Sequence, residues 1–156
     1  MNKIFFYVVV VLLSATSSAK ESEFDAKKFA NEYFQAFVAT QRPNAKPEDI
    51  ENYLSLLKDD VGSQHIPFDT DDSRMPDGKA RIRKGMTYYL ASRDKYKAEL
   101  IDIVSFGKSG VALRYKQEAS GVHPDSGKYN SYSNQRLEVL ELEDGKVAVI
   151  RIYNVE

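Results

Sequence analysis

Few side chains in this sequence have the chemistry and spacing of a reactive site. There are two histidines, His65 and His123, and no cysteine, so a zinc site would have to be completed by carboxylates. The histidines lie far apart, and neither belongs to a His-x-x-x-His or His-x-Glu spacing. A histidine titrates near neutral pH and can transfer a proton without a metal. The sequence therefore predicts no metal site and leaves acid–base chemistry as the type to look for.

The acidic loop Asp69–Asp77 has part of the pattern of a calcium-binding loop. Asp69, Asp71 and Ser73 have the spacing of the first three oxygen ligands in such a loop. However, Arg74 stands at the sixth position, where the turn requires glycine, and an alanine replaces the final glutamate. We therefore expect a solvated loop. The sequence also lacks a Gly-x-Ser-x-Gly elbow and a phosphate-binding glycine loop, so it predicts no cofactor.

Three arginines, Arg114, Arg136 and Arg151, fall on three successive predicted strands. They could form a basic stripe for an acidic ligand group. They could also pair with glutamates of the same strands, such as Glu138 and Glu141, on a face of the sheet that meets solvent. The second arrangement is the usual one for an antiparallel sheet with one wet face.

The first half of the chain has the periodicity of helices. Apolar residues recur at three- and four-residue spacing over Glu23–Thr40, then from Pro47 to Leu57, and again from about Asp77 to Leu90. Between the second and third helices, Asp59–Phe68 is predicted to be a short extended segment.

The second half has the periodicity and turn residues of strands. Long β-rich runs cover 96–106, 111–120, 129–142 and 147–155, and short glycine-containing turns separate them. Four such strands predict an antiparallel meander. Helices followed by strands predict one α+β domain, with three N-terminal helices on the concave face of a curved, mostly antiparallel sheet.

The N-terminus has the three parts of a secretory signal. Lys3 supplies a positive charge, Ile4–Leu13 is uninterruptedly apolar, and Ser14–Ala19 is small and polar. An apolar run of about ten residues is too short to cross a membrane, which needs roughly twenty. We therefore expect cleavage after Ala19 and no stable membrane insertion afterwards; an uncleaved anchor is the alternative. The expected location is the periplasm of a Gram-negative bacterium or, failing that, the extracellular medium.

The composition of Lys20–Glu156, the expected mature chain, restricts its partners. It has 21 basic and 23 acidic residues, a net charge of −2, and no basic cluster, which argues against binding to nucleic acid. Without cysteines the domain must be held by its core. Ten tyrosines and eight phenylalanines suit a semi-polar pocket or an interface.

Several segments together resemble the nuclear transport factor 2-like superfamily, which includes SnoaL-like polyketide cyclases and ketosteroid isomerase. They are the aromatic helix FANEYFQAF, the segment LSLLKDDV, the helix KARIRKGMTYYL and the closing hairpin RLEVLELEDGKVAVIRIYNV. The resemblance covers nearly all of residues 20–156. It implies a cone-shaped fold with a pocket at the wide end, and a homodimer formed through the sheet.

The resemblance also implies a catalytic set of His65, Tyr33 and Glu138. His65 falls near the position of the family's general base, although a carboxylate is absent there and the following proline lies one residue later. Tyr33 and Glu138 match the tyrosine and acid that stabilise an enolate. Each has a plainer alternative: a hydrogen-bonded histidine at the pocket rim, a core tyrosine and an outward-facing glutamate.

The expected ligand is a small, partly apolar molecule bound by Tyr33, Phe37, His65 and Tyr89. The preferred prediction is an exported binding domain without robust catalysis. One alternative is an isomerase-like enzyme acting on a carbon acid, which needs His65 and a donor in one cavity. The other is a protein–protein interaction module of the cell envelope that uses the sheet face.

Overall fold

Two layers, one of helices and one a curved sheet, make up residues 24–155, the part of the chain that the computed structural model describes. The helices are α1 (Ala26–Gln41), α2 (Pro47–Ser55) and α3 (Gly78–Tyr88). The strands are β1 (Leu57–Ile66), β2 (Arg93–Ser105), β3 (Gly110–Val122), β4 (Tyr129–Glu143) and β5 (Lys146–Val155). The expected signal peptide, residues 1–19, lies outside the described residues. No helix within the described range is long and apolar enough to cross a membrane.

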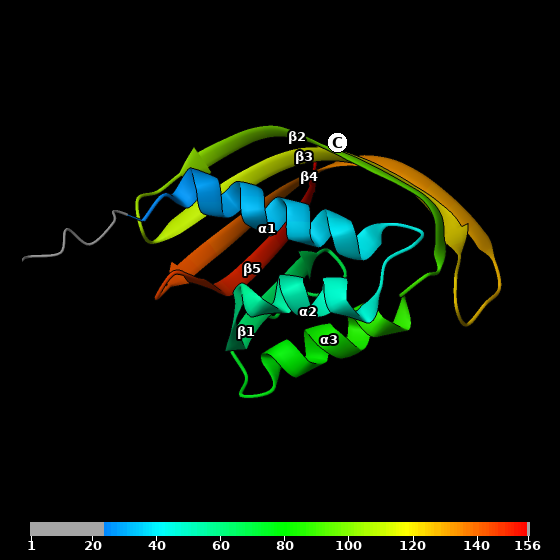
Figure 1. Ribbon diagram of the computed structural model, residues 1–156, viewed down its shortest axis with the longest axis horizontal. Coiled ribbons are helices and arrows are strands. Elements are labelled where there is room, and N and C mark those ends of the chain that lie inside the picture. The colour runs from blue at the N-terminus through cyan, green and yellow to red at the C-terminus, as the bar shows by residue number, and fades with distance from the viewer. Residues whose placement is uncertain (1–23, 156) are drawn as a thin grey trace, which may run out of the picture.

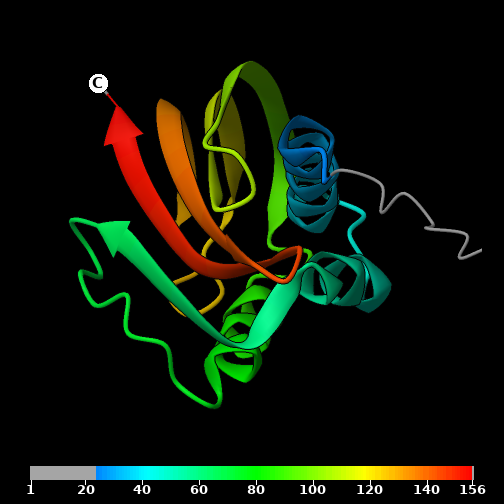
Figure 2. The same ribbon diagram turned by 90° about the vertical axis from the view of Figure 1, so that its left-hand side faces the viewer.

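The sheet has five strands in the order β1-β5-β4-β3-β2. Strands β2 to β5 form the predicted antiparallel meander, and β1 adds to its end in parallel with β5. The sheet curves around the helices, which all lie on its concave side (Figures 1 and 2). The predicted fold class, α+β with a curved and mostly antiparallel sheet, is confirmed.

The helices begin where the local sequence favours them. Asp25 caps α1 by accepting a hydrogen bond from the Lys28 backbone N–H at 3.0 Å. Pro47 occupies the first turn of α2, where its missing N–H leaves no bond unmade. Their apolar faces pack on the middle strands to form one core. The largest fully buried apolar or aromatic side chains at its centre include Tyr33, Ile50, Leu54, Leu57, Leu113, Tyr115, Leu140 and Ile150.

Several predicted boundaries were wrong. The extended segment predicted at Asp59–Phe68 is a strand of the sheet that begins earlier, so Leu57 belongs to this strand rather than to the helix. Its parallel pairing with β5, at the far end of the sequence, makes it the fifth strand of the sheet. Helix α3 ends at Tyr88, so Tyr89 lies just past the helix.

The three arginines predicted on successive strands do not lie on one face of the sheet, because neighbouring residues of a strand point to opposite faces. Arg151 lies on the outer face and donates to Glu141 at 2.5 Å and to Asp72 at 2.7 Å. Arg136 and Glu138 belong instead to the set of β4 residues that faces the helices, and Glu138 is buried. The interpretation that placed Glu138 on the solvent face was therefore wrong.

Candidate functional site

A buried carboxylate surrounded by tyrosines lies between the helices and the sheet. Glu138 Oε1 accepts a hydrogen bond from Tyr33 Oη at 2.7 Å, and Oε2 accepts one from Tyr115 Oη at 3.2 Å. The hydroxyls of Tyr33 and Tyr53 are also in contact, at 2.9 Å. All four side chains are at most 3% exposed. In this tyrosine–glutamate cluster the carboxylate joins β4 to α1 and β3, and the Tyr33 hydroxyl extends the contact to Tyr53 of α2.

Burial disfavours ionisation of the groups in this cluster. Burial raises the pKa of Glu138, and the hydrogen bond from Tyr33, the charge of Arg136 and the hydrogen bond from Tyr115 offset only part of that effect. Burial, together with the charge of Glu138, raises the pKa of Tyr33 well above its usual value. The tyrosines therefore remain neutral donors. Tyr33 and Glu138 meet as the resemblance implied, but at a place that solvent does not reach.

His65 lies on the concave side of the sheet, apart from that cluster. It pairs with Ile152 of β5, which in turn pairs with Glu138 of β4. Its Nε2 is buried and has no hydrogen-bond partner among the described residues. Burial and then the positive charge of Arg136 lower the pKa of His65. The structure thus does not join His65 to Tyr33 and Glu138 by any hydrogen bond.

A cavity of about 220 Å³ opens between the helix layer and the sheet, and we call it the inner cavity. It is lined by Phe37, Thr40, Gln41, Arg42, Gly85, Met86, Tyr89, Ala91, Arg93 and Arg136. Two of the predicted ligand-binding residues, Phe37 and Tyr89, are among these. The other two, Tyr33 and His65, do not line it.

Two arginines extend into this region from the sheet. The Nε atoms of Arg93 and Arg136 are buried without a hydrogen-bond partner in the described part of the chain. Arg93 Nη2 donates to Tyr132 Oη over 3.4 Å, and its guanidinium lies 5.8 Å from the ring centre of Tyr96. The sequence did not mark Arg93, because it precedes the strand predicted from the β-rich run.

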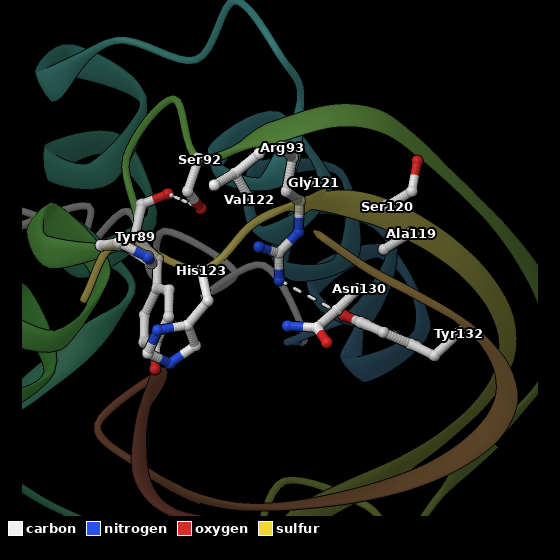
Figure 3. A pocket seen from close by; sticks show the side chains of 11 residues that line it. Tyr89, Ser92, Arg93, Ala119, Ser120, Gly121, Val122, His123, Asn130 and Tyr132 are labelled. Atoms are coloured by element: carbon white, nitrogen blue, oxygen red, sulfur yellow. Dashed lines mark hydrogen bonds between the residues drawn. The ribbon is translucent and has the colours of Figure 1, made fainter. Parts of the chain in front are cut away.

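A second hollow of about 180 Å³, the outer cavity, adjoins the inner one. Tyr89 and Arg93 line both cavities. Figure 3 shows the Arg93 guanidinium in the outer cavity near Tyr132, with His123 beside Tyr89. The inner cavity is the stronger candidate site because α1, α3 and the concave sheet face all contribute to it, whereas the outer one is formed mainly by the ends of hairpins.

The acidic loop is ordered by its own backbone. Asp69 accepts from the Asp71 N–H at 3.2 Å, and Asp71 accepts from the Ser73 N–H at 2.9 Å. In these turns an aspartate side chain accepts from the backbone N–H two residues later, which explains the spacing of Asp69, Asp71 and Ser73 without a metal. Within residues 24–155 no group of three or more histidine, aspartate or glutamate side chains is placed to hold a metal ion.

No family model matches the chain, and no curated protein is significantly similar to it. Solved structures are similar in fold. An NTF2-like (nuclear transport factor 2-like) protein from Anabaena variabilis has a TM-score of 0.61 and 18% identity, with 83% of this chain and 89% of that chain covered.

Two further structures belong to enzymes or candidate enzymes. A candidate polyketide cyclase from Pseudomonas putida has a TM-score of 0.60 and 22% identity, covering 83% of this chain and 91% of that one. An LEH-like epoxide hydrolase from M. tuberculosis has a TM-score of 0.58 and 15% identity, covering 82% and 84%. At identities this low, the structural similarity establishes the fold alone, and the chemistry has to be argued from the residues of the site. The chain therefore has the NTF2-like α+β fold.

Proposed function

We propose that this protein is an exported binding domain that holds a small, partly apolar molecule in the inner cavity. The observation that carries the proposal is the lining of that cavity. Phe37 and Met86 from the helices offer apolar surface, Tyr89 adds a ring with a hydroxyl, and Arg93 and Arg136 supply polar ends. A concave site with an apolar wall and a few polar groups is the usual form of a small-molecule site.

Binding without acid–base turnover is favoured by the burial of the carboxylate. A catalytic acid or base must come within hydrogen-bond reach of the substrate. Glu138 is 2% exposed, and both its oxygens are already occupied by tyrosine hydroxyls. The alternative, an isomerase-like enzyme, would need Glu138 or His65 to open into the cavity. Its support is the fold, which the chain shares with an epoxide hydrolase and a candidate polyketide cyclase.

A pair of substitutions at Gly85 tests the cavity. Gly85 lies exposed on α3 at the edge of the inner cavity, and a Cβ built there has no heavy atom within 4 Å. Gly85→Phe should obstruct the cavity, while Gly85→Ala adds only a methyl group and serves as the matched control. Native mass spectrometry of the protein purified from the periplasm should show a retained small molecule in the Ala variant and not in the Phe variant. Equal retention in both would place the ligand elsewhere, and no retained or added small molecule in any variant would contradict the proposal.

Export rests on the N-terminal sequence and has its own test. Expression of the full chain should yield a mature protein that begins at Lys20 in the periplasmic fraction, as read by mass spectrometry of the intact protein. Ala19→Arg should block cleavage, because the peptidase requires a small residue before the cut. Full-length protein in the cytosol of the wild-type strain would contradict export.

A further inference from the structure

Three arginines line the inner cavity, and no carboxylate does. Arg42 comes from the end of α1, Arg93 from the start of β2 and Arg136 from the middle of β4. None of the three forms an ion pair with an aspartate or glutamate of the described residues. Such a concentration of positive charge is unexpected in a chain whose net charge is −1.

The guanidinium groups of Arg93 and Arg136 act on the same place. Burial raises the pKa of Tyr96, and the charges of Arg136 and Arg93 each oppose that rise. Arg93 and Arg136 both line the inner cavity, although they are on different strands. Arg93 also lies against the Tyr96 ring.

Glu138, the one buried carboxylate among the described residues, offsets only part of the charge of the pair. Glu138 is held by Tyr33 and Tyr115, and no ion pair joins it to Arg136. With Glu138 ionised, Arg93 and Arg136 still leave one positive charge unbalanced at the cavity. Both arginines are half-buried, and each Nε is itself buried and still has a hydrogen to donate.

We infer that the ligand carries an anionic oxygen group, a carboxylate or a phosphate ester, which Arg93 and Arg136 bind while its apolar part lies against Phe37 and Met86. This inference rests on the proposed function of the inner cavity. The planar guanidinium donates paired N–H groups that match both kinds of anion. Arg42, exposed at the end of α1, adds positive charge at the cavity mouth.

The test compares charged and neutral versions of the same small molecules. Isothermal titration calorimetry would measure binding of phenylacetate, octanoate and phenyl phosphate, and of the neutral phenylacetamide, octanamide and phenol. We expect at least one anion to bind about tenfold or more tightly than its neutral analogue, and Arg136→Met and Arg93→Met each to remove most of that difference. Comparison of the carboxylates with phenyl phosphate identifies which anion is preferred.

Arg114→Met is the matched control, because Arg114 is exposed on β3 and alternates with residues that face the core. It should bind the anions as the wild type does. Should Arg136→Met fold poorly, Arg136→Lys, which keeps the charge, and Arg93→Met still test the inference, with thermal unfolding as the check on folding.

The outcomes separate the two proposals. Anions and neutral molecules that bind equally, and that Gly85→Phe excludes equally, would overturn the anion inference and leave the binding function standing. An anion preference that survives Arg93→Met and Arg136→Met would also overturn it. If no compound of either kind binds and none is retained after purification, both proposals fail.

Discussion

Glu138 places a carboxylate in the core of a domain that has no disulfide to strengthen it. Three tyrosines make this arrangement tolerable, because two donate to the carboxylate oxygens and the third contacts one of the donors. A buried polar network that is fully satisfied specifies one packing arrangement, whereas removing one donor leaves a group unsatisfied. The cluster is therefore expected to contribute stability and to fix how α1 meets the sheet.

Tyr33→Phe tests that role. It deletes the hydroxyl that contacts both Glu138 and Tyr53 while keeping the ring, so it should lower the free energy of unfolding by about 2 kcal/mol. Tyr129→Phe is the control, since its hydroxyl also donates to a carboxylate, that of Asp94, but its side chain is 59% exposed. It should change the free energy by no more than about 0.5 kcal/mol. Urea unfolding gives both values, and equal losses would contradict a structural role for the cluster.

His65 offers a second test at this scale, because the charge of Arg136 affects its pKa. Burial and that charge both disfavour the protonated imidazole and lower its pKa, and a contact with Asn154 offsets part of this. Arg136→Met removes the charge and should raise the pKa of His65. Titration by proton NMR in a His123→Gln background, which leaves a single histidine, measures it. A pKa that stays the same or falls on loss of Arg136 would contradict this arrangement; an anion bound at Arg136 should raise it.

At the scale of elements, α3 has two glycines whose surroundings are opposite. A Cβ at Gly78, at the start of the helix, would lie 2.2 Å from the backbone oxygen of Val61 on β1. At Gly85 a Cβ meets nothing within 4 Å. The close approach of α3 to β1 therefore requires glycine at position 78 and not at position 85. Since α3 carries Met86 and leads into Tyr89, its contact with β1 also sets the wall of the inner cavity.

The same substitution at the two sites should have opposite effects. Gly78→Ala must push α3 away from β1 and should destabilise the protein by about 1–3 kcal/mol, with weaker ligand binding. Gly85→Ala should stabilise it by about 0.5–1 kcal/mol, because alanine loses less backbone entropy in a helix. Thermal and urea unfolding of the two variants give the comparison. Loss of stability in both would mean that the helix tolerates no added methyl group and that the close contact is not the cause.

The elements that the sequence predicted well are those with local signals. Apolar spacing identified the three helices, and the glycine turns identified the meander. The membership of β1 in the sheet was missed because its ladder partner, β5, follows about 90 residues later and no local pattern reports such pairing. Alternation along β4 gave only relative facing, so Arg136 and Glu138 could not be assigned to the inner face without the register to β3 and β5.

The candidate site was predictable only in part for the same reason. Phe37 belongs to a helical stripe that had to face the interior, and it lines the cavity. His65 was selected by its place in a family pattern, yet it lies on β1 outside the lining. Arg93 was missed because β2 begins earlier than its β-rich run indicated; the arginine lines the cavity together with Met86 and Tyr89.

At the scale of the whole molecule, the outer edge of the sheet is where a second copy could attach. We propose the homodimer that the family resemblance implied, formed through the sheet. Strand β2 is an edge strand of the sheet. Its residues Ile101 and Val104 are 44% and 46% exposed, and Phe106, directly after the strand, is 59% exposed. An edge strand with apolar side chains pairs readily with another chain.

Val104→Lys tests this association. A charge placed within an apolar interface should raise the dimer dissociation constant by about tenfold or more, because it must be desolvated without a partner. Met75→Lys is the matched control. Met75 is 45% exposed, close to the 46% of Val104, but it lies in the acidic loop before α3 and not on β2. Sedimentation equilibrium over a range of concentrations should show a dimer for the wild type and for Met75→Lys, and a weakened one for Val104→Lys. A wild-type chain that stays monomeric throughout, or equal weakening by both substitutions, would mean that β2 is not the interface.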